Sequence, residues 1–295
     1  MSTGTALRAE QDKGRRLAQN KEKWAQGRTY ISAAVILIWC LAPAYWMVVV
    51  AFREVGFTYD TSFFPTHVTL DNFVTAFDTS FGNRFGQALL NSIFIGVVVT
   101  AISLLIGVFA AYALARLNFR GKFLVLGFIL GASMFPGVAL ITPLFQLFTN
   151  IGWMGTYQAL IIPNISFVLP LTVYTMTSFF REMPWELEES ARVDGCTQGQ
   201  AFRKVIMPLA APAIFTTAIL AFISSWNEFL IASQLSSDAT QPVTVAIANF
   251  AGAQPQQIPY TAIMAAGTIV TIPLVILVLV FQRKIVAGLT AGAVK

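Results

Sequence analysis

Residues 189–208 read ESARVDGCTQGQAFRKVIMP, a polar stretch that lies between two long apolar segments. Of the 295 residues, 56% are apolar and only 11% are charged, whereas soluble domains carry about 25% charged residues. Lipid offers no hydrogen-bond partners to the backbone, and a helix satisfies its backbone N–H and C=O groups internally. The composition therefore excludes an ordinary soluble protein and predicts an all-α polytopic membrane protein, with this stretch in a loop outside the bilayer.

The apolar segments are long enough to cross a membrane, because about 20 residues of helix span the hydrocarbon layer. Six segments of that length avoid clusters of charge: Tyr30–Phe52, Leu89–Leu114, Phe123–Phe148, Ala159–Phe180, Ala210–Leu235 and Ile263–Phe281. The sequence thus predicts a first transmembrane helix at 30–52, a loop at 53–88 and a core at 89–283 that holds the other five helices. We call residues 181–209, which interrupt this core, the polar loop.

The basic residues predict the orientation of these spans. If both termini are cytoplasmic, 17 of the 19 Lys and Arg residues lie on the cytoplasmic side, in segment 1–29, two loops and the tail 284–295. Cytoplasmic loops retain Lys and Arg, so this topology is favoured and places the polar loop in the cytoplasm. The first apolar segment exceeds the 7–15 residues of a signal peptide core, which predicts an uncleaved anchor.

The polar loop contains the signals of a helix, a bend and a second helix. Pro184 suits a first helical turn, and the acidic residues that follow favour the positive end of the helix dipole. Gly195 tolerates positive φ and ends the helix. Thr197 is a candidate N-cap for the second helix, and Pro208 is expected to limit that helix where the chain returns to the membrane.

On the second helix of the polar loop, apolar residues share one face at helical spacing: Ala201, Phe202, Val205 and Ile206. Such a face suits insertion into the groove of a partner protein. The alternative is an amphipathic helix on the lipid headgroups, with Arg203 and Lys204 touching anionic lipid. The sequence pattern by itself leaves both open.

Polar residues inside the predicted spans are candidates for a translocation pathway. Glu228 is the one formal charge well inside a span, and a charge in hydrocarbon is costly enough to suggest function. Other candidates are Asn227, Asn91, Gln146 and Asn164. Polar residues in spans also hold helices together, and we expect this role for Asn91, Gln146 and Asn164. Prolines indicate kinks in the third span, at Pro136 and Pro143, and in the fourth, at Pro163 and Pro170. These kinks are either part of a gate or static packing features.

Two kinds of chemistry find no support in the sequence. No phosphate-binding Gly-x-x-x-x-Gly-Lys-[Ser/Thr] motif is present, so ATP would have to be bound by another chain. His67 is the only histidine and has no second ligand nearby in the sequence, so we assign no metal. Cys40 and Cys196 are expected on different sides of the hydrocarbon boundary and cannot form a disulfide.

The spacing of the polar loop resembles a motif of a known family. Glu189-Ser190-Ala191, three residues, Gly195, nine residues and Val205-Ile206-Met207-Pro208 are similar to the "E-A-A, G, I-x-L-P" loop of permease subunits in bacterial ABC importers. Ser190 and Met207 replace the usual Ala and Leu and keep their size. The resemblance covers the chain from the first span onward and implies the type I ABC importer permease fold.

The resemblance also implies partners and roles. The loop would dock onto an ATPase through eight positions: Glu189, Ser190, Ala191, Asp194, Gly195, Phe202, Val205 and Pro208. A second homologous permease, two ATP-binding subunits and an extracytoplasmic sugar-binding protein would complete the complex in the bacterial cytoplasmic membrane. Membrane lipid surrounds it, and no nucleic acid is involved. ATP and Mg would reside on the ATPase, with no catalytic residue, metal or cofactor on this chain, and transport would proceed by alternating access.

Within that family the chain resembles the second, shorter permease of maltose- and trehalose-type importers, on three segments: Trp226-Asn227-Glu228-Phe229, Pro242–Ala246 and 281–295. This implies import of a di- or oligosaccharide. It also implies that the loop Ser236–Tyr260 meets the binding protein and that an extended tail reaches between the ATPases. The alternatives are an ABC permease for another polyol or glycoside, an ion-coupled secondary carrier or a membrane scaffold without transport activity.

Overall fold

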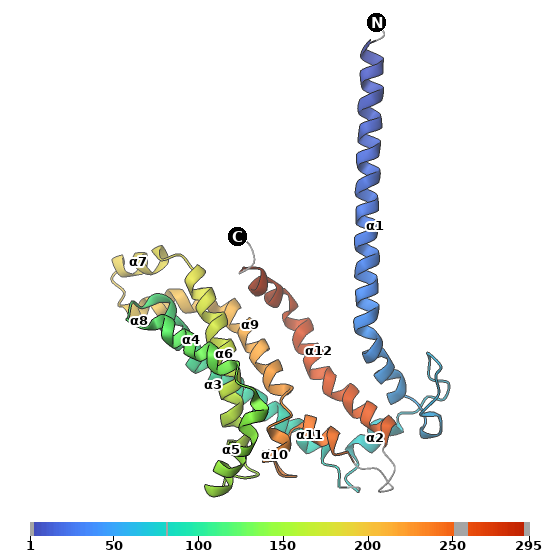
Figure 1. Cartoon of the computed structure of the whole chain (residues 1–295), viewed down its shortest axis with the longest axis vertical. Coiled ribbons are helices and arrows are strands. Elements are labelled where there is room, and N and C mark those ends of the chain that lie inside the picture. Colours follow the sequence, from blue (N-terminus) through green and yellow to red (C-terminus); the bar gives the residue numbers. More distant parts are fainter. Residues whose placement is uncertain (1–2, 81, 251–258, 292–295) are drawn as a thin grey trace.

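The protein is described by a computed structural model that covers the backbone of residues 3–80, 82–250 and 259–291, and the side chains of 24–80, 82–250 and 259–282. The described chain is helical (Figure 1). Among the described residues, five helices are long and apolar enough to cross a membrane, and a bent helix pair supplies a sixth span if counted as one. The prediction of an all-helical membrane protein is therefore confirmed.

The core is formed by α3 (Phe85–Arg116), α6 (Tyr157–Glu182) and α9 (Met207–Trp226), which pack against one another. Small residues allow their backbones to approach closely, as is common between membrane helices. A Cβ at Gly107 would lie 2.5 Å from Thr172 Cγ2 of α6, and one at Gly96 would lie 2.7 Å from Phe222 Cε2 of α9. Glycine at these two positions of α3 therefore leaves the space that α6 and α9 need to pack closely against α3.

The first and last helices lie beside this core. α1 (Thr3–Ala51) packs against α12 (Tyr260–Ala291), with Gly267 close to Met47. α1 begins at Thr3, so the backbone of residues 3–29 of the basic segment continues the helix of the first span. The backbone of α12 is likewise helical to Ala291, which corrects the extended path expected for the tail. Residues 292–295 lie outside the described residues.

The third predicted span is two helices rather than one. α4 (Lys122–Ser133) and α5 (Gly137–Asn150) meet at an angle of 87°. Pro136 is the N-cap of α5 with extended backbone angles. Because proline lacks an N–H and excludes the preceding residue from helical geometry, the helix stops before it. The kink expected at Pro136 is thus confirmed, and the predicted span Phe123–Phe148 is a sixth span only if this bent pair is counted as one.

The fifth predicted span, Ala210–Leu235, is also interrupted. α9 ends at Trp226, and the short α10 (Ala232–Leu235) follows after a turn. Both carboxylate oxygens of Glu228 accept backbone N–H groups in this turn, from Ile231 at 2.8 Å and from Ala232 at 3.0 Å. The carboxylate replaces carbonyl acceptors that a continuous helix would supply. Glu228 therefore lies in the break after a span, and its placement well inside a span is wrong.

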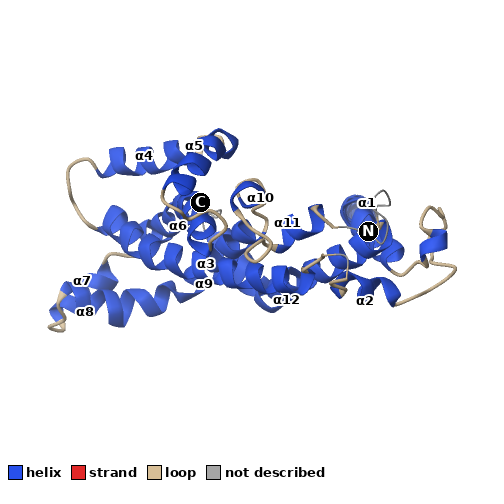
Figure 2. Ribbon diagram, turned by 90° about the horizontal axis from the view of Figure 1, so that it is seen from below, coloured by secondary structure: helices blue, strands red, loops and turns tan. Residues whose placement is uncertain are grey.

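The loops gather at two ends of the molecule. The polar loop, the loop before α4 and the C-terminal end of α12 lie at one end, toward which the N-terminal end of α1 also points (Figure 1). At the other end lie η1 (Val55–Phe57), α2 (Asp71–Phe77), α10 and α11 (Val243–Ala248). In the perpendicular view, α1 and α2 lie toward one extreme, and α4 to α8 toward the other (Figure 2). Residues 251–258 of the loop expected to meet a binding protein are outside the described residues.

Candidate functional site

The polar loop has the predicted helix, bend and second helix. α7 (Glu186–Val193) is followed by Gly195 with φ +86°, and Cys196 N donates to Ala191 O at 3.0 Å. Thr197 N donates to Gln200 Oε1 at 2.8 Å, and Gln200 N donates to Thr197 Oγ1 at 3.3 Å. This reciprocal pair is a capping box. The bend at Gly195 and the N-cap at Thr197 are thus confirmed.

The second helix of the loop does not stop at Pro208. α8 (Gln198–Ala201) passes through a π-helical turn, η2 (Phe202–Ile206), directly into α9, so that Gln198–Trp226 is one membrane-spanning candidate. Met207 N donates to Phe202 O in the wide π turn. Pro208 follows at the first turn of α9, where a missing N–H is tolerated. The limit expected at Pro208 is therefore wrong, and the second helix of the loop continues directly into a core helix.

The apolar face of this second helix is buried within the chain itself. Ala201 and Ile206 are fully buried and Phe202 is 7% exposed. The Phe202 ring lies 4.5 Å from the Tyr112 ring of α3. Val205 is half-buried. The face packs on the chain's own core, which corrects the expectation that it projects toward a partner or toward lipid headgroups.

A different set of residues is exposed on the loop. Glu189, Ser190, Asp194 and Gly195 are exposed, while Ala191 is buried at the base of α7. Val193, which is not among the predicted contact residues, is the most exposed apolar residue of the loop at 87%. A helical wheel of α7 could have found it, since Leu187 and Ala191 share the inner face and Val193 lies away from it.

The inner side of α7 is fixed to α3 by polar groups. Glu188 is 5% exposed, and the Tyr112 hydroxyl donates to its Oε1 at 2.7 Å. Arg116, one helical turn further along α3, donates from Nη2 to Met183 O at 2.6 Å, and its guanidinium lies 4.6 Å from the Trp185 ring centre. Sequence spacing provides no signal for these contacts, because 76 residues separate Tyr112 from Glu188.

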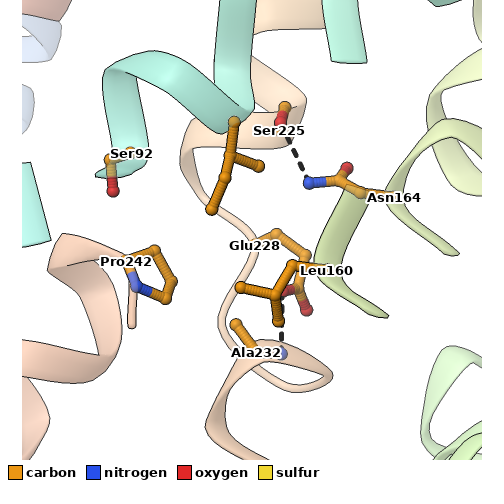
Figure 3. Close-up of a pocket in the computed structure, with 8 residues that line it drawn as sticks. Ser92, Leu160, Asn164, Ser225, Glu228, Ala232 and Pro242 are labelled. Carbon is orange, nitrogen blue, oxygen red and sulfur yellow. Dashed lines mark hydrogen bonds between the residues drawn. The ribbon is translucent and has the colours of Figure 1, made fainter. Parts of the chain in front are cut away.

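The pathway candidates separate into three groups. Asn91 is buried, and its amide donates to Ala239 O and Gln241 O at 3.0 Å, while its carbonyl accepts from Tyr157 Oη at 2.8 Å. Gln146 on α5 and Asn227 are exposed. Only Asn164 and Glu228 come together, across a small cavity of about 10 Å³ that Ser92 and Ser225 also line (Figure 3). Such a volume holds about one water molecule.

Hydrogen bonds surround that cavity, and its volume is too small for a sugar. Asn164 Nδ2 donates to Ser225 Oγ at 2.9 Å, and the Glu228 oxygens point to the N–H groups of the turn before α10 (Figure 3). Thr244 Oγ1 donates to Glu228 O at 2.7 Å, and Val243 N donates to Ser92 Oγ at 2.8 Å. Residues 228–244 are thereby tied to the core at this end of the molecule.

Comparison with known proteins identifies the family. Residues 103–290 match the family described as "Binding-protein-dependent transport system inner membrane component". The chain belongs to this family. It is accordingly a multi-pass inner-membrane permease component of a transporter, not a catalytic subunit. Among the described residues, no group of three or more His, Cys, Asp or Glu side chains is placed to hold a metal, and the His67 ring stacks on Phe57 at 3.9 Å.

Two curated relatives of this permease are similar over most of their length. The "Trehalose transport system permease protein SugB" of Mycobacterium tuberculosis is 46% identical over 274 residues, covering 92% of this chain and 99% of the relative. The "Trehalose/maltose transport system permease protein MalG" of Thermococcus litoralis is 41% identical over 266 residues, covering 90% and 95%.

A solved structure shares the fold of this permease. A chain of a bacterial ABC transporter involved in the import of the acidic polysaccharide alginate superposes with a TM-score of 0.70 at 22% identity, covering 86% of this chain and 94% of that one. At this identity the match concerns the fold alone. It agrees with the fold expected from the polar loop motif.

Proposed function

We propose that this chain is a permease subunit of an ATP-driven importer for a di- or oligosaccharide of the trehalose or maltose type, with a type I ABC importer fold and both termini in the cytoplasm. The observation that carries the proposal is the 46% and 41% identity to permeases whose names specify trehalose and maltose. The grouping of the basic loops with the polar loop at one end of the molecule supports the orientation.

In this proposal the polar loop receives the movement of a partner ATPase. Its contact surface consists of the exposed Glu189, Ser190, Asp194, Gly195 and Val193. The remaining positions of the motif hold that surface in place: Ala191, Phe202 and Val205 pack beneath it, and Pro208 opens α9. Because α8 continues into α9, a push on the loop moves a membrane helix as one lever. ATP and Mg reside on two ATP-binding subunits.

A second, homologous permease would complete the translocation pathway. α4 has no buried residue in the described chain, and Leu124 and Phe128 on it are 80% and 81% exposed. Lipid or a partner helix must cover such a surface. In this arrangement Gln146 on the neighbouring α5 and the exposed Asn227 are the candidates to line the pathway. We assign Asn91 and Asn164 to helix packing, because their side chains are buried and hydrogen-bonded.

A reconstitution experiment tests the proposed activity. The permease pair, the ATPase and the sugar-binding protein are placed in proteoliposomes, and uptake is measured for trehalose, maltose, sucrose and glucosylglycerol. We expect ATP-dependent uptake of a disaccharide that requires the binding protein. Uptake limited to glucosylglycerol or another polyol would support the alternative glycoside importer. Uptake that persists without ATP and collapses with the proton gradient would support an ion-coupled carrier, although both Glu228 oxygens are already engaged.

A second experiment tests the polar loop. Glu189→Lys reverses a charge on the exposed face of α7, and Gly195→Pro cannot adopt the φ of +86° that the bend requires. We expect ATPase copurification and transport to be lost in the double variant. Glu182→Lys, an exposed acidic residue at the end of α6, is the matched control and should leave both unchanged. Normal copurification and transport in the double variant would rule out the lever.

A further inference from the structure

The contacts between α7 and α3 place two charged groups inside the protein. Glu188 and Arg116 are 5% and 4% exposed, on α7 and α3 respectively. Burying a charge is costly unless hydrogen bonds satisfy it. Here Glu188 Oε1 accepts from Tyr112 Oη, and Arg116 Nη2 donates to Met183 O just before α7. Both groups face inward, so they lie outside the exposed surface proposed to contact the ATPase.

These buried groups are only partly satisfied. Within the described chain, Glu188 Oε2 and both Nε and Nη1 of Arg116 have no hydrogen-bond partner. If this region served stability alone, apolar residues of the same volume would serve as well or better. The arrangement instead connects α7 to α3 by one directional hydrogen bond from the Tyr112 hydroxyl. The Arg116 guanidinium adds a cation–π contact with the ring of Trp185 at the start of α7.

The helix that carries Tyr112 and Arg116 also reaches the opposite end of the molecule. Twenty residues of α3 separate Tyr112 from Ser92, which corresponds to about 30 Å of helix. Ser92 Oγ accepts from Val243 N at 2.8 Å, at the start of α11. The close contacts at Gly107 and Gly96 brace the intervening part of α3 against α6 and α9. One rigid helix therefore joins the polar loop to the loop that contains α11.

We propose that Tyr112 and Arg116 are positioning residues of the transport cycle, which hold α7 through Glu188 and through the backbone of Met183 just before the helix. Movement of the polar loop then passes along α3 to Ser92 and α11. This inference rests on the proposed function, since it assigns a route to the coupling between the ATPase side and the binding-protein side. It adds α3 to the lever formed by α8 and α9. Spatial continuity alone does not establish coupling, so the test measures coupling directly.

The experiment uses the complete reconstituted importer and counts sugar molecules imported per ATP hydrolysed. Tyr112→Phe removes the hydroxyl that donates to Glu188, and Glu188→Gln replaces the carboxylate acceptor with a neutral amide, whose hydrogen bond to Tyr112 is about half as strong. For both we expect normal ATPase copurification and basal ATP hydrolysis, with the sugar-to-ATP ratio lowered at least about fivefold, the lower range for coupling between two sites. Tyr174→Phe, which removes a hydroxyl from a 49% exposed position on α6, is the control and should leave the ratio unchanged.

A double-mutant cycle distinguishes a route through α3 from a local structural role. Ser92→Ala removes the acceptor of Val243 N at the far end. If α3 carries the movement, Tyr112→Phe combined with Ser92→Ala lowers the ratio no further than the more severe single variant does. Additive losses, or unchanged ratios in Tyr112→Phe and Glu188→Gln, would overturn the inference. Should Tyr112→Phe fail to assemble, Glu188→Gln decides alone. An unmutated importer without sugar uptake would instead contradict the proposed function.

Discussion

The core of α3, α6 and α9 and the flank of α4 and α5 have similar apolar sequences but different surroundings, although Phe148 near the end of α5 is buried against the core. In the core, a Cβ added at Gly107 or Gly96 would lie only 2.5–2.7 Å from a neighbouring side chain, and buried residues recur along each helix. On the flank, α4 has no buried residue in the described chain, and a Cβ at Gly127 or Gly131 would meet nothing within 4 Å. Hydropathy thus identifies the helices that can insert into a membrane, whereas close packing shows which of these helices contact one another in this chain.

Both regions also contain a helix break, and the breaks differ in the same way. The break after α9 is closed by the Glu228 carboxylate and tied to α11 through Thr244. The break between α4 and α5 follows from Pro136 and lies among exposed residues such as Met134, at 85%, and Phe135, at 55%. We therefore expect substitutions in the core and at its break to change stability, and substitutions on the flank to change shape.

The largest effect is expected at the break after α9. Glu228→Ala removes the acceptor for the N–H groups of Ile231 and Ala232, and hydrogen bonds to a charged group contribute about 1.5–3 kcal/mol each. We expect a loss of about 2–4 kcal/mol in the free energy of unfolding, measured by denaturation in detergent. Glu228→Gln retains one acceptor oxygen and should lose about half as much. Equal stability of Glu228→Ala and the unmutated protein would show that the turn is held by other contacts.

The next effect compares matched glycines. Gly107→Ala in α3 places a methyl group 2.5 Å from Thr172 Cγ2, and overpacking of this kind costs about 1–3 kcal/mol. Gly127→Ala in α4 meets nothing within 4 Å and should be neutral or stabilise the helix by up to about 1 kcal/mol. Thermal unfolding of both variants in the same detergent gives the difference. A destabilised Gly127→Ala with a tolerated Gly107→Ala would reverse the comparison.

The sequence predicts the helices well and their interruptions less well. The predicted spans two, four and six lie within a few residues of α3, α6 and the start of α12, because long apolar runs leave no other structure in lipid. The break after α9 is missed because hydropathy averages over Glu228, and a side chain that caps a turn does not alter that average. The sequence indicates a kink at Pro136, but its angle depends on neighbours that the sequence does not identify.

The polar loop shows a similar division between local and long-range information. The bend at Gly195 and the cap at Thr197 follow from backbone preferences within a few residues, and the sequence predicts both. The burial of Phe202 is missed because an amphipathic pattern shows that one face is covered without identifying what covers it. In this chain, that cover is Tyr112 of α3, which is 90 residues earlier in the sequence.

A third prediction concerns the shape of the flank. Pro136→Ala restores an N–H and permits helical geometry at Phe135, so α4 and α5 can join. With Phe128→Cys and Phe145→Cys as labelling sites in a background without Cys40 and Cys196, the distance should lengthen toward about 26 Å, the length of 17 residues of continuous helix. Stability should change by less than about 1 kcal/mol, as for surface sites. An unchanged distance would show that the bend does not depend on Pro136.

The smallest effect is expected in the loop after α1, which neither core packing nor the flank controls. The pKa of the half-buried Asp60 carboxyl is lowered, first by the Ser62 hydroxyl at 2.6 Å and then by the Ser62 backbone N–H at 3.1 Å. A lowered folded-state pKa stabilises the loop above the unfolded value of about 3.9 and ceases to do so as the pH falls through the folded value. We expect the protection of residues 60–66 from hydrogen exchange, measured relative to the intrinsic rate at each pH, to fall below about pH 4, while the protection of α3 remains unchanged. Asp60→Asn should accelerate loop exchange at neutral pH, and Asp71→Asn, an exposed control at the start of α2, should not. Faster exchange in α3 of the Asp60→Asn variant would mean that the core depends on this loop. The division of the molecule into a tightly packed core and independent surroundings would then be incorrect.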